Sequence, residues 1–99
     1  MYDLTTISKR YFEVKIEGIS LKLLPPKLKV LRRFQKINVN DINNSIDEII
    51  DLIRSILINN NENKNITNDF IEDNFTTDDM VGFLLSYFNW VAEVDNNPN

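Results

Sequence analysis

The sequence contains no cysteine and no histidine. Disulfides, thiol nucleophiles and zinc sites built from these ligands are therefore excluded, as is the side chain that most often serves as a general base. Gly18 and Gly82 are the only glycines, so no glycine-rich phosphate-binding loop exists. No apolar run approaches the ~20 residues of a membrane span, and the first residues lack a signal-peptide core. We expect a soluble cytoplasmic protein that is not an enzyme and uses no cofactor or metal.

Charge is unevenly distributed along a chain of 99 residues, a length that suggests one domain. Residues 1–36 contain nine Lys or Arg and three Asp or Glu, a net charge of +6, whereas residues 37–99 contain two and twelve, a net charge of −10. Such a dipolar chain can attract copies of itself or an oppositely charged partner, or it can simply have two differently charged surfaces. The acidic residues fall on polar helix faces, which does not favour a catalytic carboxylate pair.

Two short alternating segments near the N-terminus predict a β-hairpin. With a two-residue turn at Glu17-Gly18, the apolar residues pair across the strands on one face. The expected pairs are Ile16 with Ile19, Val14 with Leu21, and Phe12 with Leu23. Glutamate is a poor residue for the positive φ that such a turn requires. An isolated hairpin is only marginally stable, so we expect its apolar face to pack against helices or further strands.

Residues 26–37 predict a helix that follows Pro25-Pro26. Val30, Leu31, Phe34 and Ile37 fall on one side of it. The opposite side carries a basic strip: Lys29, Arg32, Arg33 and Lys36. Phosphate binding is the functional interpretation of this strip, but a sequence pI near 4.7 favours a solvated face or an acidic protein partner. The acidic pI therefore argues against binding of nucleic acid.

Residues 41–58 and 68–74 predict two further helices. Isoleucines recur at helical spacing in the first of them, with Asp47, Asp51 and Arg54 opposite. The Asn-rich segment 59–65 between the helices predicts a polar loop. Thr67 is expected to cap the second helix. The predicted core consists of Val14, Ile16, Leu21, Leu31, Phe34, Ile49, Ile53, Phe70, Leu84 and Phe88.

The last predicted helix, residues 77–94, is the most apolar part of the chain. Thr76 and Asp79 form a variant of the capping box that begins it. At about 100° per residue the apolar positions span roughly 220° of the helix, whereas one core-facing stripe needs only about 100°. The helix can thus cover its own core and still present apolar surface to a partner. The candidate partner-binding residues are Met80, Val81, Phe83, Leu84, Leu85, Tyr87, Phe88, Trp90 and Val91.

The wide apolar arc of this helix divides into two sides. Met80, Phe83, Leu84, Tyr87 and Val91 form one, and Val81, Leu85, Phe88 and Ala92 form the other. A monomeric core hardly needs both, so we expect one side to be partly exposed or buried against a second copy. Self-association and partner binding would then compete for the same surface.

The order of segments resembles the tail assembly chaperones of long-tailed, non-contractile bacteriophages. The resemblance covers residues 11–94 and runs from the hairpin FEVKIEGISLKL through the helix KLKVLRRFQKI to ITNDFIEDNFTTDDMVGFLLSYFNWV. Within the last segment, Thr67, Phe70 and Ile71 precede Asp73 and Phe75, and this sequence pattern is similar to one that recurs in the family.

This resemblance implies a non-enzymatic role. Such chaperones coat the helical tape measure protein, keep it soluble and help recruit tail tube subunits in the cytoplasm of the bacterial host. They are absent from the mature virion. The partners expected from the resemblance are the tape measure protein and the tail tube protein. Two alternatives remain: a structural or connector protein of a phage particle, and a small nucleic-acid-binding regulator that uses the basic strip.

The expected architecture is α+β, an N-terminal β-hairpin followed by a small bundle of about four helices. We predict a single domain over residues 11–94. A flexible N-terminal arm at residues 1–10 and a flexible tail at residues 95–99 are expected to flank it.

Overall fold

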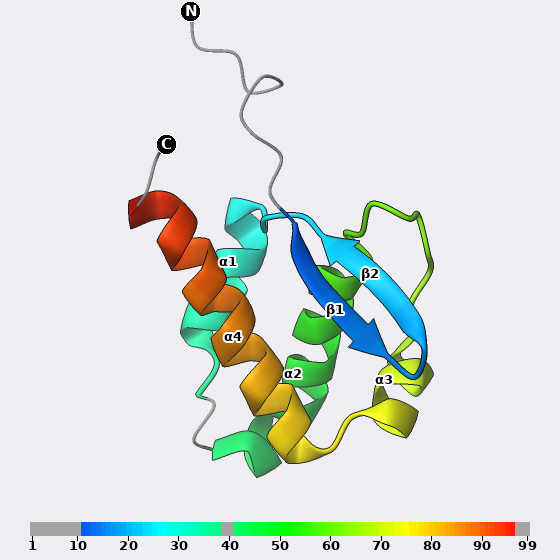
Figure 1. Cartoon of the computed structure of the whole chain (residues 1–99). Helices are drawn as coiled ribbons and strands as arrows, with labels where there is room; N and C mark the ends of the chain where they lie inside the picture. Colours follow the sequence, from blue (N-terminus) through cyan, green and yellow to red (C-terminus); the bar gives the residue numbers. More distant parts are fainter. Residues whose placement is uncertain (1–10, 39–40, 97–99) are drawn as a thin grey trace, which may run out of the picture.

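The computed structural model describes residues 11–38 and 41–96 and shows a two-stranded antiparallel sheet followed by four helices (Figure 1). The elements are β1 (Phe12–Ile16), β2 (Ile19–Leu23), α1 (Leu28–Lys36), α2 (Ile42–Leu57), α3 (Asn68–Asn74) and α4 (Thr77–Asn96). The predicted α+β layout is therefore confirmed. The predicted arm at residues 1–10 lies outside the described residues. So do residues 97–99 of the predicted tail, while the backbone of α4 continues to Asn96, beyond the expected end.

The hairpin has the predicted register. Phe12 pairs with Leu23, Val14 with Leu21, and Ile16 with Ile19. Glu17 and Gly18 have φ values of 48° and 82°, so both turn residues adopt the left-handed conformation that the tightest hairpin turns require. The alternation of apolar and polar side chains thus decides which face of the hairpin packs against the helices.

The outer edge of β2 is paired with the segment that follows α2. The amide of Leu24 donates to the carbonyl of Asn59, and the amide of Asn61 donates to the carbonyl of Lys22. The amide of Lys22 donates to the carboxylate of Glu62 at 3.0 Å. Buried Asn60 holds this segment in place through side-chain hydrogen bonds to Leu57 and Lys64. Part of the predicted polar loop is therefore an ordered cover for the sheet edge.

The core forms where α2, α4 and the apolar face of the hairpin meet. Within α2, Ile49, Leu52, Ile53 and Leu57 are fully buried, which confirms the predicted isoleucine face. α1 and α4 lie side by side because the rings of Phe34 and Phe88 stack, with centroids 4.0 Å apart and planes at 13° (Figure 1). Burial of its apolar face holds α2 in helical form, although it contains many β-branched residues, which form helices only modestly well.

Several predicted core residues are only half-buried. Val14, Leu31, Phe34 and Phe70 pack against the core but keep part of their surface exposed, and α1 contains no fully buried residue. α1 covers the bundle from outside, so each of its side chains has neighbours on one side only. The helix also begins at Leu28, two residues later than predicted, because Lys27 keeps an extended backbone. The other six predicted core residues are buried.

Candidate functional site

The first turn of α4 is fixed by reciprocal hydrogen bonds. The amide of Asp79 donates to the Thr76 hydroxyl, and the amide of Thr76 donates to the Asp79 carboxylate, each at 3.0 Å. These bonds satisfy backbone donors that a helix start otherwise leaves unpaired. The capping box predicted from Thr76 and Asp79 is confirmed.

One face of α4 is core. Five of the nine candidate partner-binding residues are buried there: Met80, Phe83, Leu84, Tyr87 and Phe88. Phe12 of β1 reaches this face, and its ring contacts those of Phe83 and Tyr87 edge-on, with centroids 6.1 and 5.5 Å apart. Partner contact with these five side chains would require the core to open.

The side of α4 that groups Phe88 with Val81, Leu85 and Ala92 is not exposed along its whole length. The division left open which side stays exposed. Phe88 is 9% exposed and stacks on Phe34 of α1, so it is part of the core, as the predicted core list has it. A helix projection reports the angular position of a residue and cannot show that α1 covers that position. Val81, Leu85 and Ala92 are the residues of this side that keep exposed surface.

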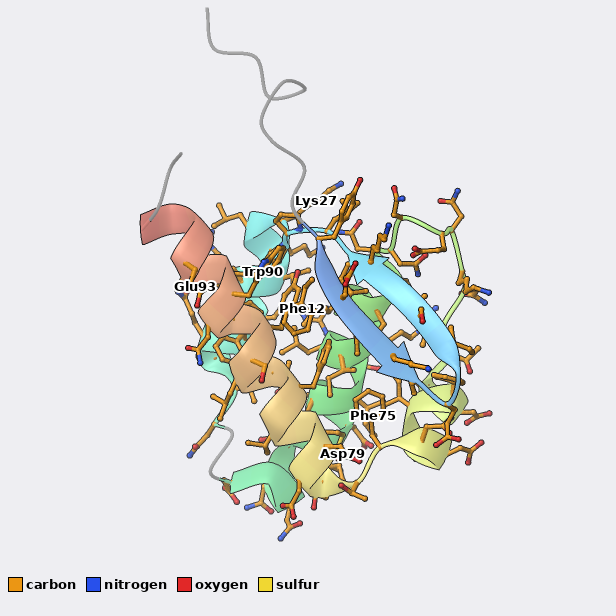
Figure 2. All side chains as sticks on the ribbon, in the orientation of Figure 1. Phe12, Lys27, Phe75, Asp79, Trp90 and Glu93 are labelled. Atoms are coloured by element: carbon orange, nitrogen blue, oxygen red, sulfur yellow. The ribbon has the colours of Figure 1, made fainter. Side chains whose placement is uncertain are left out.

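The remaining apolar surface of α4 is a narrow stripe. Leu85 is 47% exposed, Val81 is half-buried and Ala92 is exposed. Spacings of four and seven residues place all three along one side of the helix, which we call the α4 stripe. The other two candidate residues, Trp90 and Val91, are half-buried. Trp90 lies between α4 and β1, where its ring is 5.7 Å from that of Phe12 (Figure 2).

The basic strip is partly engaged inside the protein. Lys29, Arg32 and Lys36 are exposed, but the Arg33 guanidinium donates a 3.0 Å hydrogen bond to the Ser55 hydroxyl of α2. A shallow groove between α1 and α2 brings Arg33 and Lys36 beside Glu48 and Asp51. These carboxylates reduce the positive potential on that flank of the strip.

Tyr87 is buried where α4 meets the end of β2. Its ring is buried, and its hydroxyl donates a 2.7 Å hydrogen bond to the Leu24 carbonyl oxygen. Burial raises the pKa of the Tyr87 hydroxyl well above its ordinary range, because the charged phenolate would be poorly solvated there. This residue is a structural tie between α4 and the end of β2.

The described part of the chain contains no group of three or more acidic residues placed to hold a metal ion. None of its helices is long and apolar enough to cross a membrane.

A groove between β1 and α4 was missed by sequence reasoning. It has a volume of ≈ 480 Å³ and is bordered by β1 on one side and by Asp79, Gly82 and Ser86 of α4 on the other. These three residues occur at helical spacing, and Gly82 and Ser86 are small side chains between the large apolar ones of this helix. Their small size was the signal that could have indicated a depression, but the neighbouring strand could not be placed from sequence.

No protein-family model, curated protein or solved structure matches this chain. The resemblance to tail assembly chaperones therefore remains a prediction.

Proposed function

We propose that this protein is a non-enzymatic assembly chaperone of bacteriophage tails that binds the helical tape measure protein through the α4 stripe. The observation that supports this proposal is the exposure of Leu85 beside Val81 and Ala92 on a helix whose inner face is already filled. An apolar surface that binds an amphipathic helix needs such a stripe, because the apolar side chains of the partner are removed from water when they pack against it.

The size and rim of the stripe suit a partner that is later released. Its apolar area is small, which keeps the free chaperone soluble. Asp78 and Glu93 are exposed on the same helix, and acidic side chains at the rim favour a partner helix with basic flanks. In this proposal the chaperone acts in the cytoplasm of the bacterial host, helps recruit the tail tube protein, and leaves before the virion is complete.

Co-production with a tape measure protein tests this proposal. The chain is expressed together with the tape measure protein of the genome that encodes it, and the soluble fraction of the tape measure protein is measured. We expect Leu85→Glu to reduce that fraction severalfold, since a charge at the centre of the stripe would be desolvated on binding. Asn43→Glu on exposed α2 surface is the matched control and should leave solubility unchanged.

Two results would overturn the proposal. One is a tape measure protein that is equally insoluble with and without the chain. The other is the chain's presence at stoichiometric amounts in purified particles by mass spectrometry, which would favour the alternative structural role.

A further inference from the structure

One wall of the groove between β1 and α4 is the outer edge of β1. In a hairpin with a two-residue turn, the closing pair, here Ile16 and Ile19, exchanges backbone hydrogen bonds. From there along β1, the backbone groups of successive residues point alternately toward β2 and away from it. The backbone groups of Glu13 and Lys15 therefore point away from β2, into the groove. No residue that the structure describes forms a hydrogen bond with these outward backbone groups of Glu13 and Lys15.

The two edges of the hairpin thus differ. The outer groups of β2 are occupied by Asn59, Asn61 and Glu62. The outer edge of β1 faces α4 (Figure 2), and no described residue is bonded to the donors and acceptors of Glu13 and Lys15 on this edge. Unpaired strand edges are templates for an added strand. A helix could not serve there, because its own backbone groups are already bonded to each other.

The opposite wall leaves space for a second backbone. Gly82 and Ser86 lie one turn apart on α4, and a Cβ placed on Gly82 would meet no atom within 4 Å. Phe75 and Phe83 supply apolar surface in the same groove, with rings in edge contact at 6.1 Å. At ~3.3 Å per residue, the wall from Glu13 to Glu17 spans about four residues of an extended chain.

The position of α4 excludes a second copy of this domain as the occupant. A β1 strand from another copy would bring its own β2 on its far edge. That second strand would have to occupy the space of α4, which forms the opposite wall. The groove can take one lone strand, with β1 on one side and α4 on the other.

The charges around the groove select a basic strand. Glu13, Glu17 and Asp79 border it, against a single cation, Lys15. The Asp79 carboxylate already accepts a hydrogen bond from the Thr76 amide, which fixes it at the rim. Anionic groups held in place attract Lys or Arg on an approaching segment.

We infer that the groove between β1 and α4 binds a short extended segment of a partner protein, about four residues long, which adds to the edge of β1 as a third strand. The segment carries apolar residues facing Phe75 and Phe83, and Lys or Arg facing the acidic rim. This site is separate from the α4 stripe and does not depend on the proposed chaperone function.

The test uses the full chain labelled with ¹⁵N and a synthetic peptide, acetyl-Thr-Val-Lys-Val-Lys-Thr-amide, followed by NMR. We expect saturable shifts in the amides of Glu13, Lys15 and Gly82. An acidic peptide with Glu in place of Lys should bind at least about tenfold more weakly. A peptide N-methylated on the residues that face β1 should also bind at least about tenfold more weakly, since it cannot donate backbone hydrogen bonds.

Gly82→Leu fills the groove and should reduce binding by at least about tenfold, while Asn89→Leu, on exposed α4 surface outside the groove, should not. Both variants should remain folded, because each position is exposed and leucine is a good helix former. The inference is overturned by an absence of shifts at millimolar peptide, by equal binding of all three peptides, or by binding that Gly82→Leu leaves intact. Concentration-dependent shifts at Glu13 and Lys15 without peptide would also overturn it, because the edge would then pair with a second copy.

Discussion

The hydroxyl of Tyr87 in α4 reaches the carbonyl oxygen of Leu24 at 2.7 Å, across 63 residues of sequence. Leu24 directly follows β2, so this one hydrogen bond ties the last helix to the hairpin. Both walls of the β1–α4 groove and the orientation of the α4 stripe depend on how these two parts are held together.

Replacing Tyr87 with Phe should lower the free energy of unfolding by about 0.5–1.5 kcal/mol near neutral pH. The variant keeps the ring and its packing but leaves the Leu24 carbonyl without its donor. Urea unfolding followed by circular dichroism measures the difference. A variant as stable as the parent at pH 7 would show that water replaces the hydroxyl at no cost.

The stability advantage of Tyr87 over Phe should shrink in alkali. Burial raises the pKa of Tyr87 in the folded state above the value of about 10 expected when unfolded. Above about pH 10 the unfolded chain loses this proton while the folded chain keeps it, so stability falls by up to about 1.4 kcal/mol per pH unit. The advantage is complete below pH 10 and is lost as pH rises toward the folded-state pKa. An advantage that stays constant from pH 7 to 10.5 would contradict a raised pKa.

Ile53→Ala should cost about 2–5 kcal/mol of unfolding free energy. Ile53 is fully buried in α2, and truncation leaves a cavity that its neighbours cannot fill. Asp47→Ala, at an exposed position of the same helix, is the control and should change stability by no more than about 0.5 kcal/mol. Similar unfolding midpoints for both variants would place Ile53 outside the core.

The hairpin turn should tolerate Asn better than Glu at position 17. Glu17 has a φ of 48°, a conformation that Asn adopts readily and β-branched residues strongly disfavour. We expect Glu17→Asn to stabilise the protein by a few tenths of a kcal/mol and Glu17→Val to destabilise it by about 1–2 kcal/mol. Thermal unfolding of the three proteins measures this order, and Glu17→Val at least as stable as the parent would contradict the turn geometry.

Charges at two neighbouring positions of α4 should have opposite consequences. Tyr87→Glu puts a carboxylate into the core and should unfold the protein, whereas Leu85→Glu changes an exposed side chain and should leave the fold intact. Circular dichroism reports folding, and analytical ultracentrifugation reports whether Leu85→Glu also abolishes any self-association of the parent. If Leu85→Glu unfolds as well, the stripe is ordinary core.

Local periodicity was enough to predict the elements of this fold. The pairing of Val14 with Leu21 followed from alternation, and the burial of Ile49 and Ile53 followed from helical spacing, because each pattern depends only on near neighbours in sequence. The half-burial of Leu31 could not be predicted in this way, since it depends on α1 lying outside the bundle.

The candidate surfaces were harder to predict for the same reason. The sequence pattern left open which side of α4 stays exposed, because Phe34, which covers Phe88, lies on a different helix far away in the sequence. The groove beside β1 likewise needs the position of α4 relative to Glu13 and Lys15. Sequence pattern identified which residues are apolar, while tertiary packing decided which of them remain at the surface.

The binding role of the α4 stripe can be measured at one residue, because the natural sequence has no cysteine. Leu85→Cys is labelled with an environment-sensitive fluorophore and mixed with the tape measure protein of the same genome, and Asn43→Cys carries the same label as the control. The chaperone proposal predicts a blue shift and increased emission at position 85 and no change at position 43. An unchanged spectrum at position 85 in mixtures where the tape measure protein remains soluble would contradict the assignment of the α4 stripe as its binding surface.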